Sequence, residues 1–148
     1  MTEHYTKEGK TSTLLRKLFN TTDLEKFMEC NADEMMIPSF HDYITKMCRK
    51  TEQVPEQVIK QAIIERTYGH QLFNGTRKPS RDKVIQLAFG FKLNLADTQK
   101  LLQIAQKSPL YPKIKRDAAI LFCISHHIDI LETQSVLHSL GLTLLGGE

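Results

Sequence analysis

The stretch that decides the fold lies at residues 55–80 and reads PEQVIKQAIIERTYGHQLFNGTRKPS. Pro55 suits the first turn of a helix, because the N–H that proline lacks would have no partner there. Apolar residues then follow at helical spacing, at Val58, Ile59 and Ala62. Gly75 can end a second helix in a left-handed conformation, and Ser80 can cap a third. The stretch therefore predicts two short helices joined by a tight turn, followed directly by another helix.

Helical periodicity continues on both sides of this stretch. Ser39 precedes an apolar stripe at helical spacing, formed by Phe40, Ile44, Met47 and Cys48. Leucine and phenylalanine recur in the same way at residues 14–19, and Thr22-Asp23 can cap a further short helix. No alternating apolar run bounded by hairpin turns occurs. We therefore expect an all-α protein.

One internal repeat is visible at an offset of 35 residues. Arg81-Asp82 returns as Arg116-Asp117, and Thr98-Gln99 returns as Thr133-Gln134. The apolar positions between these identities also correspond. Each copy therefore predicts a longer helix, a short turn and a second helix, and two stacked copies would bury a shared core. Chance similarity between amphipathic helix pairs is the alternative explanation.

Charge is distributed unevenly along the chain. The formal net charge is only +3, yet residues 60–116 hold twelve Lys or Arg against three acids, a net of +9. The segments before and after carry net charges of −2 and −4. A positive segment favours phosphate binding, because counterion release at phosphates contributes to DNA affinity. A solvated basic face would give the same composition, so the charge needs a motif beside it.

Other features narrow the class of protein. The start of the chain lacks the apolar region of a secretory signal, and no apolar run is long enough to span a membrane. Three widely spaced cysteines predict reduced thiols, and we expect a cytoplasmic location. Cys123 and His127 lie one helical turn apart without further evident ligands, so neither a metal nor a cofactor is expected. No catalytic arrangement stands out, and an enzyme is not expected.

The run at 55–80 resembles the helix-turn-helix of the phage-repressor and Cro type, the lambda-repressor-like DNA-binding family. In that family a short helix ends at a small residue, here Ala62, and an apolar residue follows in the turn, here Ile64. Leu72 matches the core position of the recognition helix, and residues 74–80 match the glycine-containing basic exit. The resemblance covers roughly residues 39–105, about half of the chain.

The resemblance implies a bacterial-type protein that binds duplex DNA with a recognition helix at about residues 65–73. Such a helix enters the major groove, which is about 12 Å wide. Its outer face would carry the side chains that read bases, namely Arg66, Thr67, His70 and Gln71. The flanking phosphates would be contacted by Asn74, Arg77, Lys78, Arg81 and Lys83.

Besides Val54, which replaces the Ser or Thr expected to cap the first helix, three positions depart from the family pattern. Ile63 stands where the turn commonly has glycine, Gly69 replaces an apolar residue of the recognition helix, and Phe73 replaces an acid before the exit. We predict that Tyr68 turns inward over Gly69 to restore packing. The same departures favour an alternative function, a protein-interaction module that retains the scaffold without binding DNA.

We expect three segments: an N-terminal helical extension at 1–38, a DNA-binding domain at 39–107, and a C-terminal helix pair at 108–148 packed on it. The expected fold is a lambda-repressor-like bundle extended by this repeated pair. The expected function is sequence-specific binding of double-stranded DNA by a transcriptional regulator. The apolar, acidic C-terminal helices would either pack on the core or form a homodimer, which would read two half-sites about 34 Å apart.

Overall fold

The computed structural model describes residues 2–146, with side chains described from Thr11 onward. All regular structure in this range is helical, so the predicted all-α class is confirmed. The elements are α1 (Thr2–Asn20), α2 (Leu24–Cys30), the 3-10 helix η1 (Ala32–Met35), α3 (Phe40–Lys50), α4 (Pro55–Gln61), α5 (Arg66–Asn74), α6 (Arg81–Phe91), α7 (Leu95–Ile104), α8 (Lys115–Ser125) and α9 (Ile130–Ser139). Within the described range, no helix combines the length and the apolar character that a membrane span requires.

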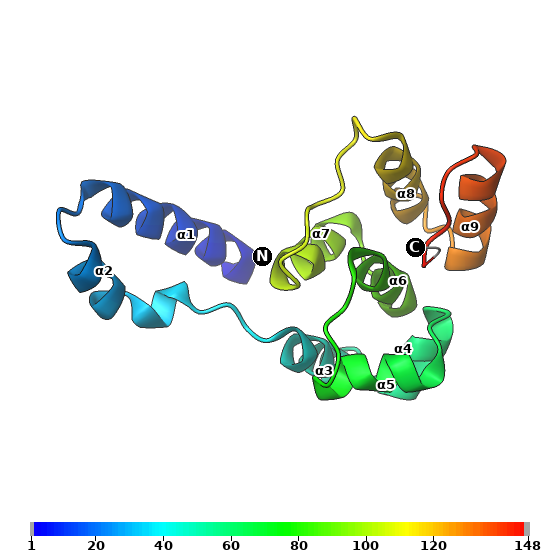
Figure 1. The fold of residues 1–148 in the computed structure, drawn as a ribbon, viewed down its shortest axis with the longest axis horizontal. Coiled ribbons are helices and arrows are strands. Elements are labelled where there is room, and N and C mark those ends of the chain that lie inside the picture. Colours follow the sequence, from blue (N-terminus) through cyan, green and yellow to red (C-terminus); the bar gives the residue numbers. More distant parts are fainter. Residues whose placement is uncertain (1, 147–148) are drawn as a thin grey trace. The chain divides into compact units, whose positions relative to one another are not determined.

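The chain divides into two compact units, residues 1–37 and 38–148. In the first unit, α1 and α2 form a helical hairpin followed by η1 (Figure 1). Asp23 begins α2 as predicted, since its carboxylate accepts a hydrogen bond from the Lys26 N–H at 3.1 Å. Among the described side chains of this unit, Phe27 is the one that is buried. The large exposed apolar side chains are Leu15, Leu18, Phe19, Leu24, Met28, Met35, Met36 and Ile37.

In the second unit, α6 is the central helix and packs against α4, α7 and α9 (Figure 1). Apolar side chains from α3 through α9 form one core around it. Its largest fully buried aliphatic side chains are Ile44, Leu72, Ile85, Leu87, Leu101, Leu102, Ile120 and Leu137. The core therefore holds the helices of the 55–80 stretch and the C-terminal helix pair in one body.

Three helical hairpins of this unit share one turn conformation. A residue within two positions of the end of the first helix is left-handed in each, with φ of 54° at Glu52, 58° at Lys92 and 55° at His127. The next residue donates its N–H back into the helix, as from Leu93 to Ala88 and from Ile128 to Cys123, both at 2.9 Å. The α3–α4, α6–α7 and α8–α9 pairs are thus built alike.

The sequence repeat corresponds to a reciprocal pair of ion pairs. Arg81 donates from both terminal nitrogens to Asp117, at 3.1 and 2.9 Å. Arg116 donates in the same way to Asp82, at 2.9 and 2.8 Å. Both carboxylates are buried, with 2% and 5% of the side chain exposed at Asp117 and Asp82. Each copy therefore supplies the arginine for the acid of the other, so the two copies close on each other.

The same repeat also fixes the connections after α7 and α9. The Gln99 side chain donates to Leu110 O and accepts from Leu110 N, at 2.9 and 2.8 Å. Gln134 makes the same two bonds with Leu145, also at 2.9 and 2.8 Å. Thr98 and Thr133 are fully buried and bond back within their own helices. The similarity at offset 35 is thus carried by matched hydrogen bonds as well as by apolar spacing.

Candidate nucleic-acid interface

The turn between α4 and α5 is built around a left-handed isoleucine. The Ile64 N–H donates to Ile59 O at 3.2 Å, and the Ile63 N–H donates to Lys60 O at 3.1 Å. This pair of bonds is the Schellman pattern, which requires a left-handed residue just beyond the helix and usually has glycine there. Here Ile63 adopts φ of 55°, which is unusual for a β-branched residue. The α4–α5 turn therefore has a left-handed isoleucine at the position where glycine would be free of strain.

Helix α5 packs closely on α4 because Gly69 has no side chain. A Cβ added at Gly69 would stand 2.4 Å from the Ile59 side chain, far inside contact distance. Leu72 and Phe73 complete the inner face, and Phe73 lies against Phe91 with ring centroids 6.3 Å apart. The unexpected glycine and phenylalanine thus serve packing. The Ile59 side chain fills the space over Gly69 from α4. Tyr68 is half-buried and packs against the core, so it turns partly inward as predicted.

Tyr68 is half-buried at the edge of the core, and two cations lie over the face of its ring. The Arg77 guanidinium lies 4.5 Å from the centre of its ring and the Lys83 ammonium 5.4 Å. These distances are in the range of cation–π attraction, in which the electron-rich ring face holds a positive charge. Tyr68 therefore helps to hold two of the predicted phosphate-contacting side chains beside the first turn of α5.

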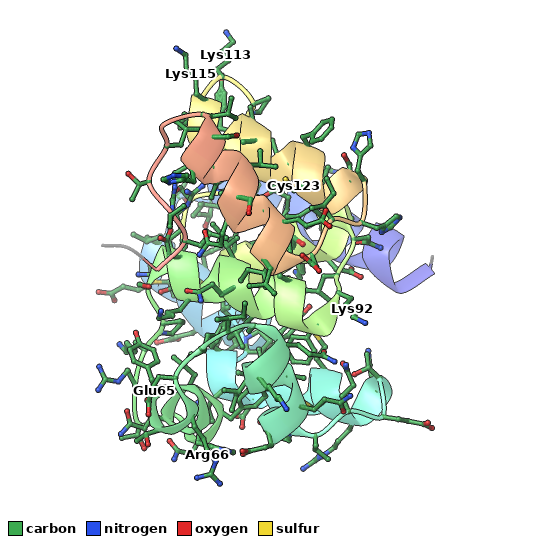
Figure 2. All side chains as sticks on the ribbon, turned by 90° about the vertical axis from the view of Figure 1, so that its right-hand side faces the viewer. Glu65, Arg66, Lys92, Lys113, Lys115 and Cys123 are labelled. Atoms are coloured by element: carbon green, nitrogen blue, oxygen red, sulfur yellow. The ribbon has the colours of Figure 1, made fainter. Side chains whose placement is uncertain are left out.

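The predicted base-reading residues occupy the outer side of α5. Arg66 and Thr67 are exposed, and His70 and Gln71 are half-buried. Glu65 begins the helix, and its carboxylate accepts from the Tyr68 N–H at 2.7 Å. Backbone N–H groups hold the pKa of Glu65 below its ordinary range, with Tyr68 the largest contributor. Figure 2 shows Arg66 projecting away from the helices at one end of the unit.

One carboxylate holds two of these side chains. Glu56, in the first turn of α4, accepts from Arg66 Nε at 2.7 Å through one oxygen and contacts His70 Nε2 through the other. The hydrogen bonds from Arg66 and then His70 hold the pKa of Glu56 below its ordinary range, while Glu56 raises that of Arg66. The acid orients the arginine, and it also cancels positive charge on the face that would meet DNA.

The exit from α5 presents a second polar group. Gly75 ends the helix with φ of 83°, as predicted, and Asn74 Oδ1 accepts from the Thr76 N–H at 2.9 Å. Arg77 donates from Nε to Gln71 Oε1 at 3.0 Å, which links the exit to the outer face of α5. Asn74, Arg77 and Lys78 are exposed, where a phosphate could reach them.

The two remaining predicted phosphate contacts lie on α6 and have other partners. Besides its ion pair with Asp117, Arg81 donates to two backbone oxygens, Ser108 O at 3.0 Å and Pro109 O at 2.9 Å. A phosphate would have to compete with these bonds, so we leave Arg81 out of the proposed interface. Lys83 donates to Gln86 Oε1 at 3.1 Å while its ammonium stays over Tyr68.

Sequence reasoning missed the role of three residues at this site: Glu56, Tyr68 and Gln86. The Gln86 side chain is buried in α6, and its Nε2 donates to Ala62 O and Ile63 O, at 3.2 and 3.3 Å. It thereby satisfies the carbonyl groups of the α4–α5 turn. A polar residue in the middle of an apolar helix was the signal that could have marked Gln86. Glu56 had no comparable signal, because its partners lie ten and fourteen residues away.

The basic segment does not form one face. Lys113 and Lys115 project at the end of the unit opposite Arg66 (Figure 2). Arg81 and Arg116 are held in the reciprocal ion pairs. The charge of residues 60–116 in the sequence therefore overstates the positive charge at α5. Arg66, Arg77 and Lys78 lie on α5 or its exit, and Lys83 reaches the Tyr68 ring of α5 from α6.

Among the described residues, no group of three or more histidine, cysteine or acidic side chains is placed to hold a metal ion. Cys48 and Cys123 are buried and Cys30 is exposed, all as free thiols. Comparisons of the chain with protein-family models, with curated proteins and with solved structures give no match. Function must therefore be inferred from the geometry of the chain itself.

Proposed function

We propose that the chain binds double-stranded DNA in a sequence-specific manner and acts as a transcriptional regulator, with α5 lying in the major groove. The observation that carries this proposal is the way α5 is held. Gly69 lets the helix seat closely on α4, and this leaves a polar outer face on a rigid support. Recognition helices need such a support, because base contacts require side chains placed to within fractions of an ångström.

Three of the polar side chains on this face have a matching DNA partner. Arg66 can donate in fork geometry to guanine, Gln71 can pair with adenine, and Thr67 can contact a thymine methyl group. Arg77 and Lys78 at the exit suit the neighbouring phosphates. Glu56 keeps Arg66 extended along α4 before DNA arrives, so that the bond to guanine would replace the bond to the carboxylate.

The test is a titration by fluorescence anisotropy on mixed duplex DNA at several salt concentrations. We expect affinity to fall steeply with salt, and the slope to decrease by about two in the Arg77→Ala/Lys78→Ala variant. The matched control, Lys113→Ala/Lys115→Ala, removes the same charge at the opposite end of the unit and should leave the slope unchanged. An equal change in both variants would contradict the assignment of the face.

Sequence reading is tested separately with Arg66→Ala/Gln71→Ala. Duplexes selected on the wild-type protein should lose their advantage over mixed DNA in this variant, because each good base contact contributes about 1–3 kcal/mol of discrimination. No binding of wild type at about 50 mM salt, where phosphate contacts are strong, would exclude the DNA-binding proposal.

The N-terminal unit favours a second candidate function, a module that binds another protein. Its described side chains include eight large exposed apolar residues, with Met36 76% and Phe19 75% exposed. Large exposed apolar patches on soluble proteins usually mark interaction sites. An apolar helical surface is the partner that such a hairpin fits, and the C-terminal helices offer a homodimer contact of the same kind at Phe122, Leu131 and Leu140.

Sedimentation velocity of the full chain tests this second candidate. Self-association that is lost in Phe19→Glu/Met36→Glu would assign the contact to the N-terminal unit. Self-association that persists there and is lost in Leu131→Glu/Leu140→Glu would assign it to the C-terminal helices instead. A monomer at all concentrations up to about 100 μM would exclude a homodimer of ordinary strength.

A further inference from the structure

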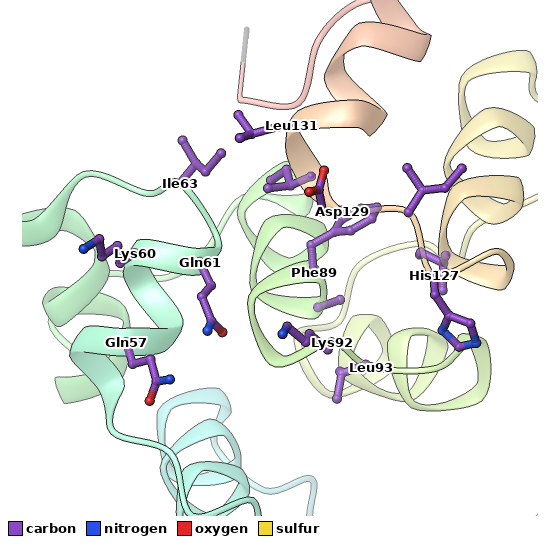
Figure 3. A pocket seen from close by; sticks show the side chains of 14 residues that line it. Gln57, Lys60, Gln61, Ile63, Phe89, Lys92, Leu93, His127, Asp129 and Leu131 are labelled. Atoms are coloured by element: carbon purple, nitrogen blue, oxygen red, sulfur yellow. The ribbon is translucent and has the colours of Figure 1, made fainter.

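A cleft of about 820 Å³ opens in the second unit between α4, the α6–α7 turn and the α8–α9 turn (Figure 3). This volume is in the range of sites for small organic molecules. It is lined on one side by Gln57, Lys60, Gln61 and Ile63, and on the other sides by residues of the two turns. The face of α5 that we propose for DNA does not line it, so the cleft needs a function of its own.

The lining combines apolar surface with unbalanced positive charge. Phe89, Leu93 and Ile128 are half-buried apolar side chains of the two turns. Lys60 and Lys92 also line the cleft, and neither side-chain ammonium has an ion-pair or hydrogen-bond partner among the described residues.

Asp129 is the acid among the lining residues. It begins α9, and its Oδ1 accepts from the Glu132 N–H at 2.9 Å. No ion pair joins Asp129 to Lys60 or Lys92 among the described residues. The two lysines and this one acid leave the lining with excess positive charge for an incoming anion.

Gln61 adds an unsatisfied hydrogen-bonding group. Its Oε1 is buried and has no hydrogen-bond partner among the described residues. In Figure 3 the Gln61 amide extends into the space that Lys92 reaches from the facing wall. Buried polar atoms are nearly always paired in folded proteins, and an unpaired one can mark a group whose partner binds from outside. A hydrogen-bond donor on a ligand, or Lys92 drawn inward by an anion, would satisfy this oxygen.

The proposed DNA contact does not explain why isoleucine, rather than glycine, stands at position 63 in the α4–α5 turn. It holds a left-handed backbone, which is unfavourable for a β-branched side chain, and 48% of it is exposed. Glycine would remove the strain, and the exposed side chain adds little to the core. Strained residues of this kind tend to cluster at functional sites. Lys92 and His127, two further left-handed residues, line the same cleft.

The position of Ile63 beside the cleft suggests a use for its side chain. Ile63 and Leu131, which is 64% exposed, project beside the cleft from the α4–α5 turn and from α9 (Figure 3). An apolar ligand body between them would cover both side chains, which gain nothing from solvent exposure. Contact with such a ligand would give the isoleucine side chain a use that glycine could not supply.

We propose that this cleft binds a small organic anion with a flat apolar body, such as an aromatic carboxylate. Its carboxylate pairs with Lys60 and Lys92, and its ring packs against Phe89 and between Ile63 and Leu131. The ligand joins α4 to the C-terminal helix pair, so it stabilises the packing of the two. This proposal rests on the cleft alone and holds whether or not the chain binds DNA.

The test uses amide chemical shifts of the ¹⁵N-labelled full chain with 2-naphthoate as the probe and uncharged 2-naphthamide as its matched control. For a ligand of this size we expect a Kd of about 1 mM. Shifts should concentrate at residues 60–63, 88–93 and 127–131, and 2-naphthamide should bind about threefold more weakly. Shifts centred instead on Leu15, Phe19 and Met36 would overturn the proposal. So would the absence of shifts at probe concentrations up to about 10 mM, which is ten times the expected Kd.

Two variants separate ligand binding from folding. Ile63→Gly should raise the melting temperature, because the strain is relieved, and should weaken 2-naphthoate binding about threefold by loss of apolar contact. Lys60→Gln/Lys92→Gln should abolish the preference for 2-naphthoate over 2-naphthamide. An Ile63→Gly variant that is more stable and binds the probe as well as wild type would refute the role of Ile63 and with it the site.

Discussion

The reciprocal ion pairs predict a large and specific loss of stability when one carboxylate is removed. Replacing Asp117 by alanine removes the two charge-assisted hydrogen bonds that the Arg81 guanidinium donates. Only 26% of the Arg81 side chain is exposed, so water replaces these bonds poorly. The Tyr111 N–H loses its acceptor at 3.0 Å as well. Removing one partner of a buried pair typically costs about 3–5 kcal/mol. We take the lower half of that range here, because Arg81 keeps its bonds to Ser108 O and Pro109 O.

Urea unfolding followed by circular dichroism at helix wavelengths measures this loss. The expected decrease in the free energy of unfolding is about 3–4 kcal/mol, a large part of the 5–15 kcal/mol of an ordinary domain. The matched control is Asp129→Asn, which removes an exposed acid from the same repeat but retains a helix-capping oxygen. It should change stability by less than about 0.5 kcal/mol.

A double-mutant cycle then isolates the pair. Arg81→Met/Asp117→Ala removes both charges and should be more stable than Asp117→Ala, because no charge is left buried without a partner, and Arg81→Met alone completes the cycle. A loss below about 1 kcal/mol for Asp117→Ala, or a coupling energy near zero in the cycle, would refute the reasoning. Either result would mean that water replaces the carboxylate at little cost.

Three further outcomes follow from the site. Gly69→Ala should cost about 1–3 kcal/mol in urea unfolding, because its Cβ would stand 2.4 Å from Ile59, whereas an Ala at an open helical position would stabilise. Because the pKa of Glu56 is lowered in the folded protein, its contribution to stability is present above the ordinary value of 4.5 and is lost as pH falls through the lowered value. The melting temperature of wild type should therefore exceed that of Glu56→Gln above this window, and the difference should disappear below it. A difference that stays constant with pH would contradict the pairing. Ellman's reagent should react quickly with the exposed Cys30 and slowly with Cys48, whose thiol pKa is raised by burial, and equal rates would contradict the packing.

Local signals in the sequence predicted most of the helices and their ends. Pro55 begins α4, Gly75 ends α5 in a left-handed conformation, and Ser80 caps α6 by accepting from the Lys83 N–H at 3.3 Å. These features depend on residues within one turn of each other, which is why they could be predicted. Ser39 stands at the start of α3 as expected, but its hydroxyl donates to the Asp42 carboxylate at 2.7 Å instead of accepting from the backbone.

The meaning of the unusual residues in the 55–80 stretch required the packing. In the sequence, Gly69 and Phe73 are departures from a pattern. In the structure, Gly69 leaves room for the Ile59 side chain, and Phe73 packs against Phe91. The cations that lie over the Tyr68 ring were likewise not evident from the sequence. Packing joins residues from different helices, and a single sequence does not say which helices meet.

The sequence by itself determined the helical class, the helix boundaries and the repeat, because these follow from propensity, capping and periodicity along a short stretch of chain. Only the tertiary structure decided where the charges act. It directs Arg81 to Asp117, places Glu56 against Arg66 and sends Lys113 to the far end of the unit (Figure 2). Electrostatic effect depends on distance through space, and residues 36 apart in sequence can lie in contact while neighbours along the chain face opposite ways.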